Sequence, residues 1–180
     1  MLFFRFISLS FTLVALLFPF NAHSQSSLPY NMTLVDFNSQ QPVPLAQHRG
    51  QVVYIDFWAS RCLPCRDAFQ FTNELTHTFK NEDLVIIGVN LDTERDRSKA
   101  LTFLKDYPAE FSLVSDPQKQ FAQSLNVNVM PTSLIFDKEG QLVMRMVGFN
   151  RSKAERVKDQ IHQLIHPAPS VTSSSKNAQQ

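Results

Sequence analysis

The sequence contains only two cysteines among its 180 residues, and only two residues separate them. A disulfide that closes so short a loop constrains little of the unfolded chain, so it would add little stability as a cross-link. A four-ligand zinc site would need two further good ligands. No third cysteine exists, and no matching motif surrounds the histidines His48, His77, His162 and His166. The scarcity of cysteine therefore favours a chemical role for the pair over a structural or metal-binding one.

Charge is scarce as well. Charged residues make up 18% of the chain, and the formal net charge is +1. A net charge this small gives no reason to expect binding to nucleic acid or to a strongly charged membrane surface. Apolar residues make up 43%, which is enough for a hydrophobic core. The length predicts one domain with appendages, and no internal repeat is evident.

The chain also lacks an apolar run of the ~20 residues that a membrane-spanning helix needs. Its apolar stretch covers residues 7–20, follows the single basic residue Arg5, and precedes the polar stretch 21–24. This pattern is typical of a secretory signal peptide, and Ala22-x-Ser24 fits the small-x-small cleavage rule. We therefore predict a signal peptide over 1–24, and we favour its cleavage over retention as a membrane anchor.

Strand-like and helix-like segments alternate through the rest of the chain. Apolar and β-branched runs predict strands over 32–37, 51–58, 84–90, 111–114, 132–136 and 141–147. Helical patterns cover about 63–80, 93–107, 117–125 and 151–165, and residues 39–50 form a turn-rich connection. The pattern predicts an α/β domain over 32–165, with helices on both faces of a sheet. A loose segment at 25–31 precedes this domain, and a disordered tail at 166–180 follows it.

The segment from Trp58 to Arg66 joins a buried strand to a helix and carries Cys62-Leu63-Pro64-Cys65. Two intervening residues at a helix start bring both sulfurs within bonding reach. The unpaired N–H groups and the dipole of the helix N-terminus favour a thiolate at the first cysteine, while the second is more shielded. We therefore predict that Cys62 attacks partner disulfides and that Cys65 resolves the mixed disulfide. Pro64 is compatible with the first turn because its missing N–H would have no partner there.

Two charged residues flank this motif. Asp56 lies on the preceding strand among Val52, Val53, Ile55 and Phe57, where burial raises the pKa of a carboxyl group. We predict that Asp56 points under the cysteine pair and exchanges a proton with the Cys65 thiol; the alternative is a solvent-facing aspartate at a strand end. Arg61 precedes Cys62, and a nearby cation favours its thiolate. The alternative for Arg61 is that it points into water, where screening makes its effect small.

The stretch Phe57-Trp58-Ala59-Ser60-x-Cys62-x-Pro64-Cys65-Arg66 resembles the active site of the thioredoxin superfamily, and most closely that of its TlpA/ResA-type exported oxidoreductases. Residues 45–50, 86–90 and 129–132 resemble further motifs of that group in the same order, so the resemblance covers 32–165. It implies a thioredoxin fold with a central mixed β-sheet flanked by helices and an inserted strand–helix element before a cis-proline. Two departures are that Arg61 replaces the usual tryptophan, and that Asp56 stands where many exported members have asparagine.

The resemblance also implies a groove for partner chains beside the cysteine pair. Pro131 matches the family's cis-proline, which faces that pair, so a cis Met130–Pro131 bond is implied. We place Trp58, Arg61, Pro64 and Met130 in the same groove as Pro131.

The sequence thus predicts a thiol–disulfide oxidoreductase that uses the Cys62–Cys65 redox-active disulfide without a cofactor or metal. We expect it to act as a reductant in the periplasm, as a monomer. Its expected partners are cysteine-containing exported proteins and a membrane or periplasmic electron donor, with no nucleic acid. The resemblance implies cytochrome c maturation as one pathway, and general disulfide reduction is the other.

Two other functions compete with this prediction. A peroxiredoxin-type peroxidase would need a single peroxidatic thiol in its own activating loop, and no such loop is seen. A copper- or haem-handling chaperone would bind its metal through the two thiolates, together with Met130 or a histidine. Metal retained after purification under reducing conditions would separate the chaperone from the dithiol enzyme.

Overall fold

The computed structural model describes residues 26–167. Seven strands form one sheet in the order β2-β1-β5-β4-β3-β6-β7. Their bounds are β1 (Thr33–Asp36), β2 (Pro42–Pro44), β3 (Val52–Trp58), β4 (Leu84–Asn90), β5 (Ser112–Ser115), β6 (Thr132–Phe136) and β7 (Leu142–Val147). The helices are α1 (Cys65–Thr78), α2 (Arg97–Asp106), α3 (Gln120–Ser124) and α4 (Arg151–Ile165), with short 3₁₀ turns at η1 (Leu45–His48) and η2 (Glu94–Asp96).

The centre of the sheet is β3, which pairs in parallel with β4 and antiparallel with β6. Every residue of β3 is buried, as its nearly continuous apolar sequence predicts. Because successive side chains point to opposite faces, Val53, Ile55 and Phe57 enter one core cluster, whereas Val52 and Tyr54 enter another. The two-sided burial of β3 confirms the predicted α/β architecture around a mixed sheet.

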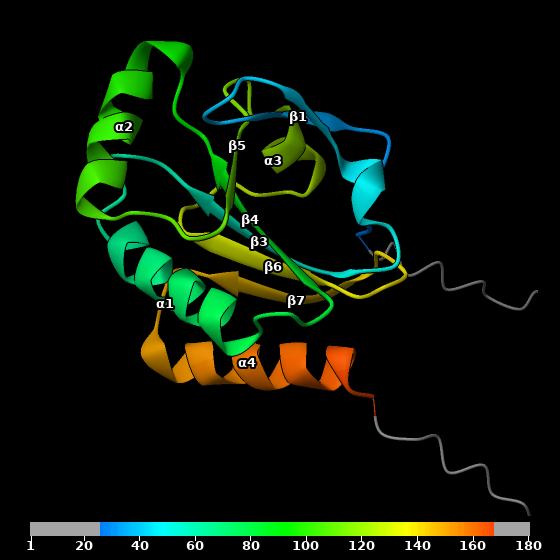
Figure 1. Cartoon of the computed structure of the whole chain (residues 1–180). Coiled ribbons are helices and arrows are strands. Elements are labelled where there is room, and N and C mark those ends of the chain that lie inside the picture. The colour runs from blue at the N-terminus through cyan, green and yellow to red at the C-terminus, as the bar shows by residue number, and fades with distance from the viewer. Residues whose placement is uncertain (1–25, 168–180) are drawn as a thin grey trace, which may run out of the picture.

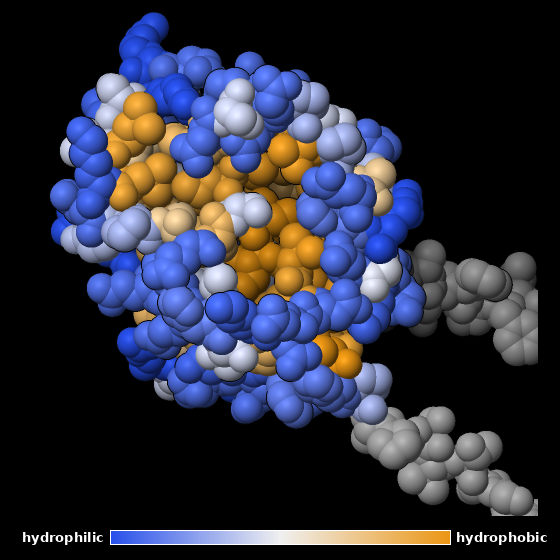
Figure 2. Space-filling view, in the orientation of Figure 1, coloured by the Kyte–Doolittle hydropathy of each residue, from blue (hydrophilic) through white to orange (hydrophobic). Residues whose placement is uncertain are grey.

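Helices cover both faces of this sheet. On one face α1 and α4 lie side by side (Figure 1), and Arg151 of α4 forms an ion pair with Glu74 of α1. On the opposite face α3 supplies Phe121, which packs in the cluster of the odd-numbered β3 residues. Figure 2 shows hydrophobic side chains gathered over the middle of this view, to the right of α2 and above α1, where Figure 1 places β4 and β5.

Two segments predicted to be irregular are ordered in the structure. Residues 26–31 were expected to be loose, but Ser27 forms a β-bridge with Gln141, and the Leu28 N–H donates to the Gly140 carbonyl at 2.8 Å. Leu28 also inserts into the core, at 2% exposure. Tyr30 also packs against this core, so both backbone pairing and apolar contacts hold the segment. Within the turn-rich stretch at 39–50, residues 42–44 form β2 and pair with β1.

The predicted signal peptide at 1–24 lies outside the described residues, as does most of the predicted tail, from residue 168 onward. Over residues 26–167, no helix has both the length and the apolar character needed to cross a membrane.

Candidate active site

The cysteine pair lies where β3 passes into α1. Cys62 and Cys65 form a disulfide with their Cα atoms 5.3 Å apart. The sequence predicts a helix from about residue 63, but α1 begins at Cys65, with Pro64 at its N-cap. Cys62 therefore belongs to the turn before the helix, and its carbonyl accepts a hydrogen bond from the Cys65 N–H at 3.1 Å. The turn closes the pair without interrupting the helix behind it.

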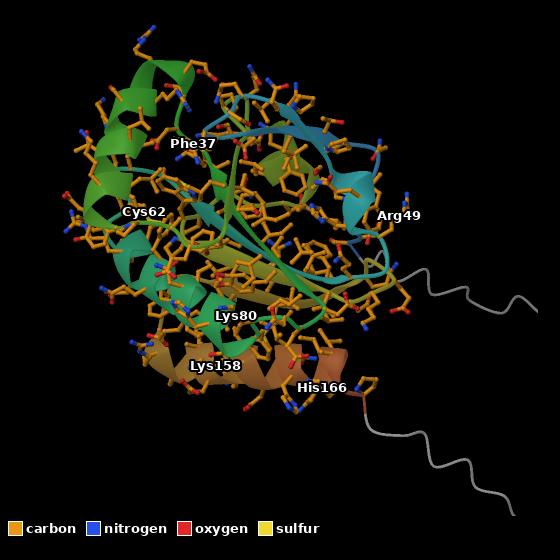
Figure 3. The ribbon with its side chains drawn as sticks, in the orientation of Figure 1. Phe37, Arg49, Cys62, Lys80, Lys158 and His166 are labelled. Carbon is orange, nitrogen blue, oxygen red and sulfur yellow. A yellow bond between two sulfur atoms is a disulfide. The ribbon has the colours of Figure 1, made fainter. Side chains whose placement is uncertain are left out.

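The two sulfur-bearing residues differ in exposure. Cys65 is fully buried, whereas Cys62 is partly exposed and packs at the border of a cluster that contains Cys65. Figure 3 places Cys62 at the edge of the molecule, near the approach of α1 to α2. An approaching partner can therefore reach Cys62 and not Cys65, which is the asymmetry that the spacing predicts.

Trp58 does not lie in a groove, contrary to the sequence-based placement. Its side chain is fully buried, and its ring lies 4.8 Å from the ring of Phe69, 5.1 Å from that of Phe103 and 6.2 Å from that of Phe37. As an even-numbered residue of β3, it points inward under α1 and α2. Trp58 thus supports the cysteine turn from behind and is not accessible to a partner chain.

The segment with Pro131 contributes to the packing of the cluster that contains Cys65. The Met130–Pro131 peptide bond is cis. Met130 is half-buried and packs against the same cluster as Cys62 and Cys65, while Pro131 is buried. The preceding residue, Val129, is an exposed apolar side chain, at 54% exposure.

Arg61 faces solvent. Its side chain is 75% exposed, and its Nη2 lies 3.8 Å from Oδ1 of Asp96. The same Asp96 carboxylate also pairs with Lys99. Solvent and the Asp96 charge both weaken any field from Arg61 at Cys62, which favours the alternative interpretation of this residue.

Asp56 is buried completely, so the alternative of a solvent-facing aspartate is wrong. Its Oδ1 accepts a hydrogen bond from the Ser133 hydroxyl at 2.9 Å across the β3–β6 pair, while its buried Oδ2 has no hydrogen-bond partner among residues 26–167. Burial raises the pKa of Asp56 to about 7, and the hydrogen bond from Ser133 opposes this shift. The carboxyl group can therefore bind or release a proton near neutral pH.

Close packing at β4 leaves Asp56 without a polar side chain opposite it on that strand. Gly88 stands opposite Asp56 in the parallel register. A Cβ at position 88 would come within 2.6 Å of Cε2 of Phe111 and 2.8 Å of Cδ2 of Leu113, so only glycine leaves room for these side chains. The neighbouring position on β4 consequently provides no side chain that could pair with the Asp56 charge.

Sequence reasoning missed a second carboxylate that organises the site. Asp92 accepts hydrogen bonds from the Ser60 N–H at 2.8 Å and from the Ser60 hydroxyl at 3.0 Å, and Asn90 donates to it at 2.9 Å. These bonds hold the start of the cysteine turn against the end of β4. The signal was present, since Ser60 and Asp92 each follow the end of one of two adjacent parallel strands. Within residues 26–167, no group of three or more His, Cys, Asp and Glu side chains is placed to hold a metal ion.

Comparison with known proteins gives a consistent result. The model of the AhpC/TSA family matches residues 28–145. The chain is 27% identical over 131 residues to a thiol-disulfide oxidoreductase ResA of Bacillus cereus, covering 73% of this chain and 70% of that protein. It is 29% identical over 126 residues to ResA of Bacillus subtilis, covering 69% and 68%.

A solved structure extends the likeness to three dimensions. It is that of a Chlorobium tepidum protein provisionally assigned as the thiol:disulfide interchange protein DsbE, with a TM-score of 0.71 and 33% identity over 78% of this chain and 96% of that one. The chain therefore belongs to the AhpC/TSA family and is a thioredoxin-fold thiol–disulfide oxidoreductase of the ResA and DsbE type.

Proposed function

We propose that this protein reduces disulfides of exported proteins through a cycle of Cys62 and Cys65. The Cys62 thiolate attacks one sulfur of the partner disulfide, and the partner's second sulfur leaves as a thiolate. The Cys65 thiol then loses its proton and attacks the Cys62 sulfur of the mixed disulfide. This step releases the partner's first sulfur. The partner gains two electrons and, with them, two protons, and this protein is left with the Cys62–Cys65 disulfide.

The observation that carries this proposal is the unequal exposure of the two cysteines. A partly exposed Cys62 can reach a sulfur on another chain, whereas a fully buried Cys65 can react only with Cys62. Attack and resolution are therefore assigned to different residues by access alone. A thiol–disulfide exchange enzyme needs this division, because a mixed disulfide must be opened from within.

Asp56 is the residue that we assign to the proton of Cys65. Its neighbours on the same side of β3 are Tyr54, which packs with α1 and α4, and Trp58, which packs with Cys65. Asp56 therefore lies under the start of α1. A general base is most effective when its pKa is close to the working pH, which a carboxyl group with a pKa of about 7 satisfies. Its unpartnered Oδ2 is the atom available to accept the proton.

The compartment and the partner are part of the same proposal. The signal-like residues 1–24 support export, and disulfides that need reduction form in the oxidising periplasm. We assign the protein to the periplasm as a monomer, where a membrane or periplasmic dithiol donor returns two electrons to Cys62 and Cys65. Apocytochrome c, whose CxxCH cysteines must be reduced before haem attachment, is the partner to test first.

The experiment is a mixed-disulfide trap with Cys65→Ala in the producing bacterium. This variant is expected to hold partners covalently on Cys62, and mass spectrometry of the captured proteins should find exported proteins with cysteine pairs, apocytochrome c among them. Cys62→Ala serves as the matched control and is expected to trap nothing. Equal trapping by both variants would contradict the assigned roles. A Cys62–Cys65 pair found fully oxidised in growing cells would contradict the reducing direction.

A further inference from the structure

A pocket of about 370 Å³ opens beside the cysteine turn, between the start of α1 and the outer side of α2. Its volume lies within the range of about 300–1,000 Å³ that is typical of ligand sites. Ser60, Arg61 and Arg66 line it from the active-site segment, and Lys99 and Tyr107 line it from α2 and its end. Each of the two cysteines therefore has a direct chain neighbour in the wall of this pocket.

Positive charge predominates in the lining. Three cations line the pocket, namely Arg61, Arg66 and Lys99, against the single carboxylate of Asp106. A second carboxylate, Asp96, lies beside the pocket and pairs with both Arg61 and Lys99. Two of the three cations therefore already have a common counter-charge.

Arg66 is the cation that remains. Within the described part of the chain, no carboxylate forms an ion pair with it. Its guanidinium lies over the ring of Tyr107, 5.3 Å from the centroid, which orients the planar group. A contact with the face of a ring uses none of the arginine N–H donors, and these donors match the geometry of a carboxylate.

We propose that this pocket binds an acidic side chain of the partner polypeptide, next to the cysteine that Cys62 attacks. The inference rests on the proposed function and adds a preference in sequence to it. Arg66 follows Cys65 directly, so a carboxylate on Arg66 would lie close to the site of exchange. Because the pocket is open to water, the preference should be modest in size and sensitive to salt.

The test measures the rate at which the reduced protein opens a short peptide disulfide. Three peptides differ only in the residue next to one cysteine, which is Glu, Gln or Lys. At low ionic strength the Glu peptide is expected to react about two- to fivefold faster than the Gln peptide, and the Lys peptide more slowly than both. The ratio of the Glu to the Gln rate should fall toward one at about 0.5 M salt.

Substitutions at Arg66 test whether this pocket causes the preference for the Glu peptide. Arg66→Gln is expected to bring the Glu-to-Gln ratio to about one, and Arg66→Lys to leave an intermediate ratio, because lysine keeps the charge but not the planar fork. Lys80→Gln removes a cation from an exposed position just beyond the C-terminal end of α1 (Figure 3), and this control should keep the wild-type ratio.

Three results would overturn the inference. They are equal rates for the Glu and Gln peptides at low salt, a ratio that survives Arg66→Gln, and faster reduction of glutathione disulfide than of the Glu peptide. The last result would place a small carboxylate-bearing thiol, and not a polypeptide, in the pocket. The Gln peptide separates this test from the proposed function, since a failure to reduce it at all would count against the function itself.

Discussion

Replacing Asp56 with asparagine should make the stability of the protein less dependent on pH, and the structure gives both sign and size. In the folded protein burial raises the pKa of Asp56 from 3.8 to about 7. Below the lower value the carboxyl group is protonated in both the folded and the unfolded chain, so it adds no pH-dependent cost. Between the two values the unfolded chain releases this proton and the folded chain keeps it. The free energy of unfolding therefore falls as the pH rises through this window.

The size follows from the width of the window. A shift of about three pKa units corresponds to about 4 kcal/mol, which is the full cost of ionising this buried group. Asparagine keeps the shape of the side chain, has no charge to bury, and can still accept the hydrogen bond from Ser133. Asp56→Asn is thus expected to match the wild type at about pH 4 and to exceed its free energy of unfolding by up to about 4 kcal/mol at about pH 8.

Urea unfolding of the oxidised protein at several pH values is the appropriate assay, because the intact disulfide keeps both cysteines from titrating. Asp159→Asn on the exposed face of α4 serves as the matched control and should follow the wild-type pH dependence. A stability difference between Asp56→Asn and the wild type that stays constant from about pH 4 to about pH 8 would refute the reasoning. The carboxyl group would then ionise in the folded protein without a burial cost.

Three further substitutions test residues that pack around Asp56 and the cysteine turn. Ser133→Ala removes the hydroxyl that favours ionised Asp56, so the pH–rate profile of mixed-disulfide resolution should move to higher pH. Ser133→Thr keeps the hydroxyl and should move the profile little. A move to lower pH would contradict the assignment of Asp56 as the base for Cys65. Asp92→Ala removes two hydrogen bonds to Ser60 and should cost about 1–3 kcal/mol in urea unfolding. An Asp92→Asn variant as unstable as Asp92→Ala would show that these bonds are not the cause. Gly88→Ala introduces a methyl group 2.6 Å from the nearest ring carbon and should cost about 1–3 kcal/mol, so an unchanged melting temperature would be inconsistent with the packing.

Sequence patterns were sufficient to predict the features that depend only on neighbouring residues in the chain. The alternation and composition of residues 51–58 and 84–90 predict two buried strands, and β3 and β4 fall within these ranges. The helical period over 151–165 predicts α4 with its observed bounds. The spacing of Cys62 and Cys65 is local too, since one turn of backbone brings the two residues together whatever surrounds them.

Other features depend on which segments the fold places side by side. The acid at position 56 is visible in the sequence, but its hydrogen-bond partner Ser133 lies 77 residues away on β6. Ser60 and Asp92 are separated by 32 residues and meet because β3 and β4 are adjacent and parallel. Pairings of this kind follow from which strands lie side by side in the sheet, which no local period encodes.

By itself, the sequence determined the α/β class and the exchange chemistry of the cysteine pair, because each depends on short-range spacing and composition. The order of attack by the two cysteines stays a prediction from the same spacing. Only the tertiary structure decided that Trp58 is enclosed by Phe37, Phe69 and Phe103, and that Arg61 shares its counter-charge with Lys99. Exposure and the electric field at a side chain are sums over neighbours that arrive from all parts of the chain. Exposure and electric field are therefore fixed only when those neighbours have packed together.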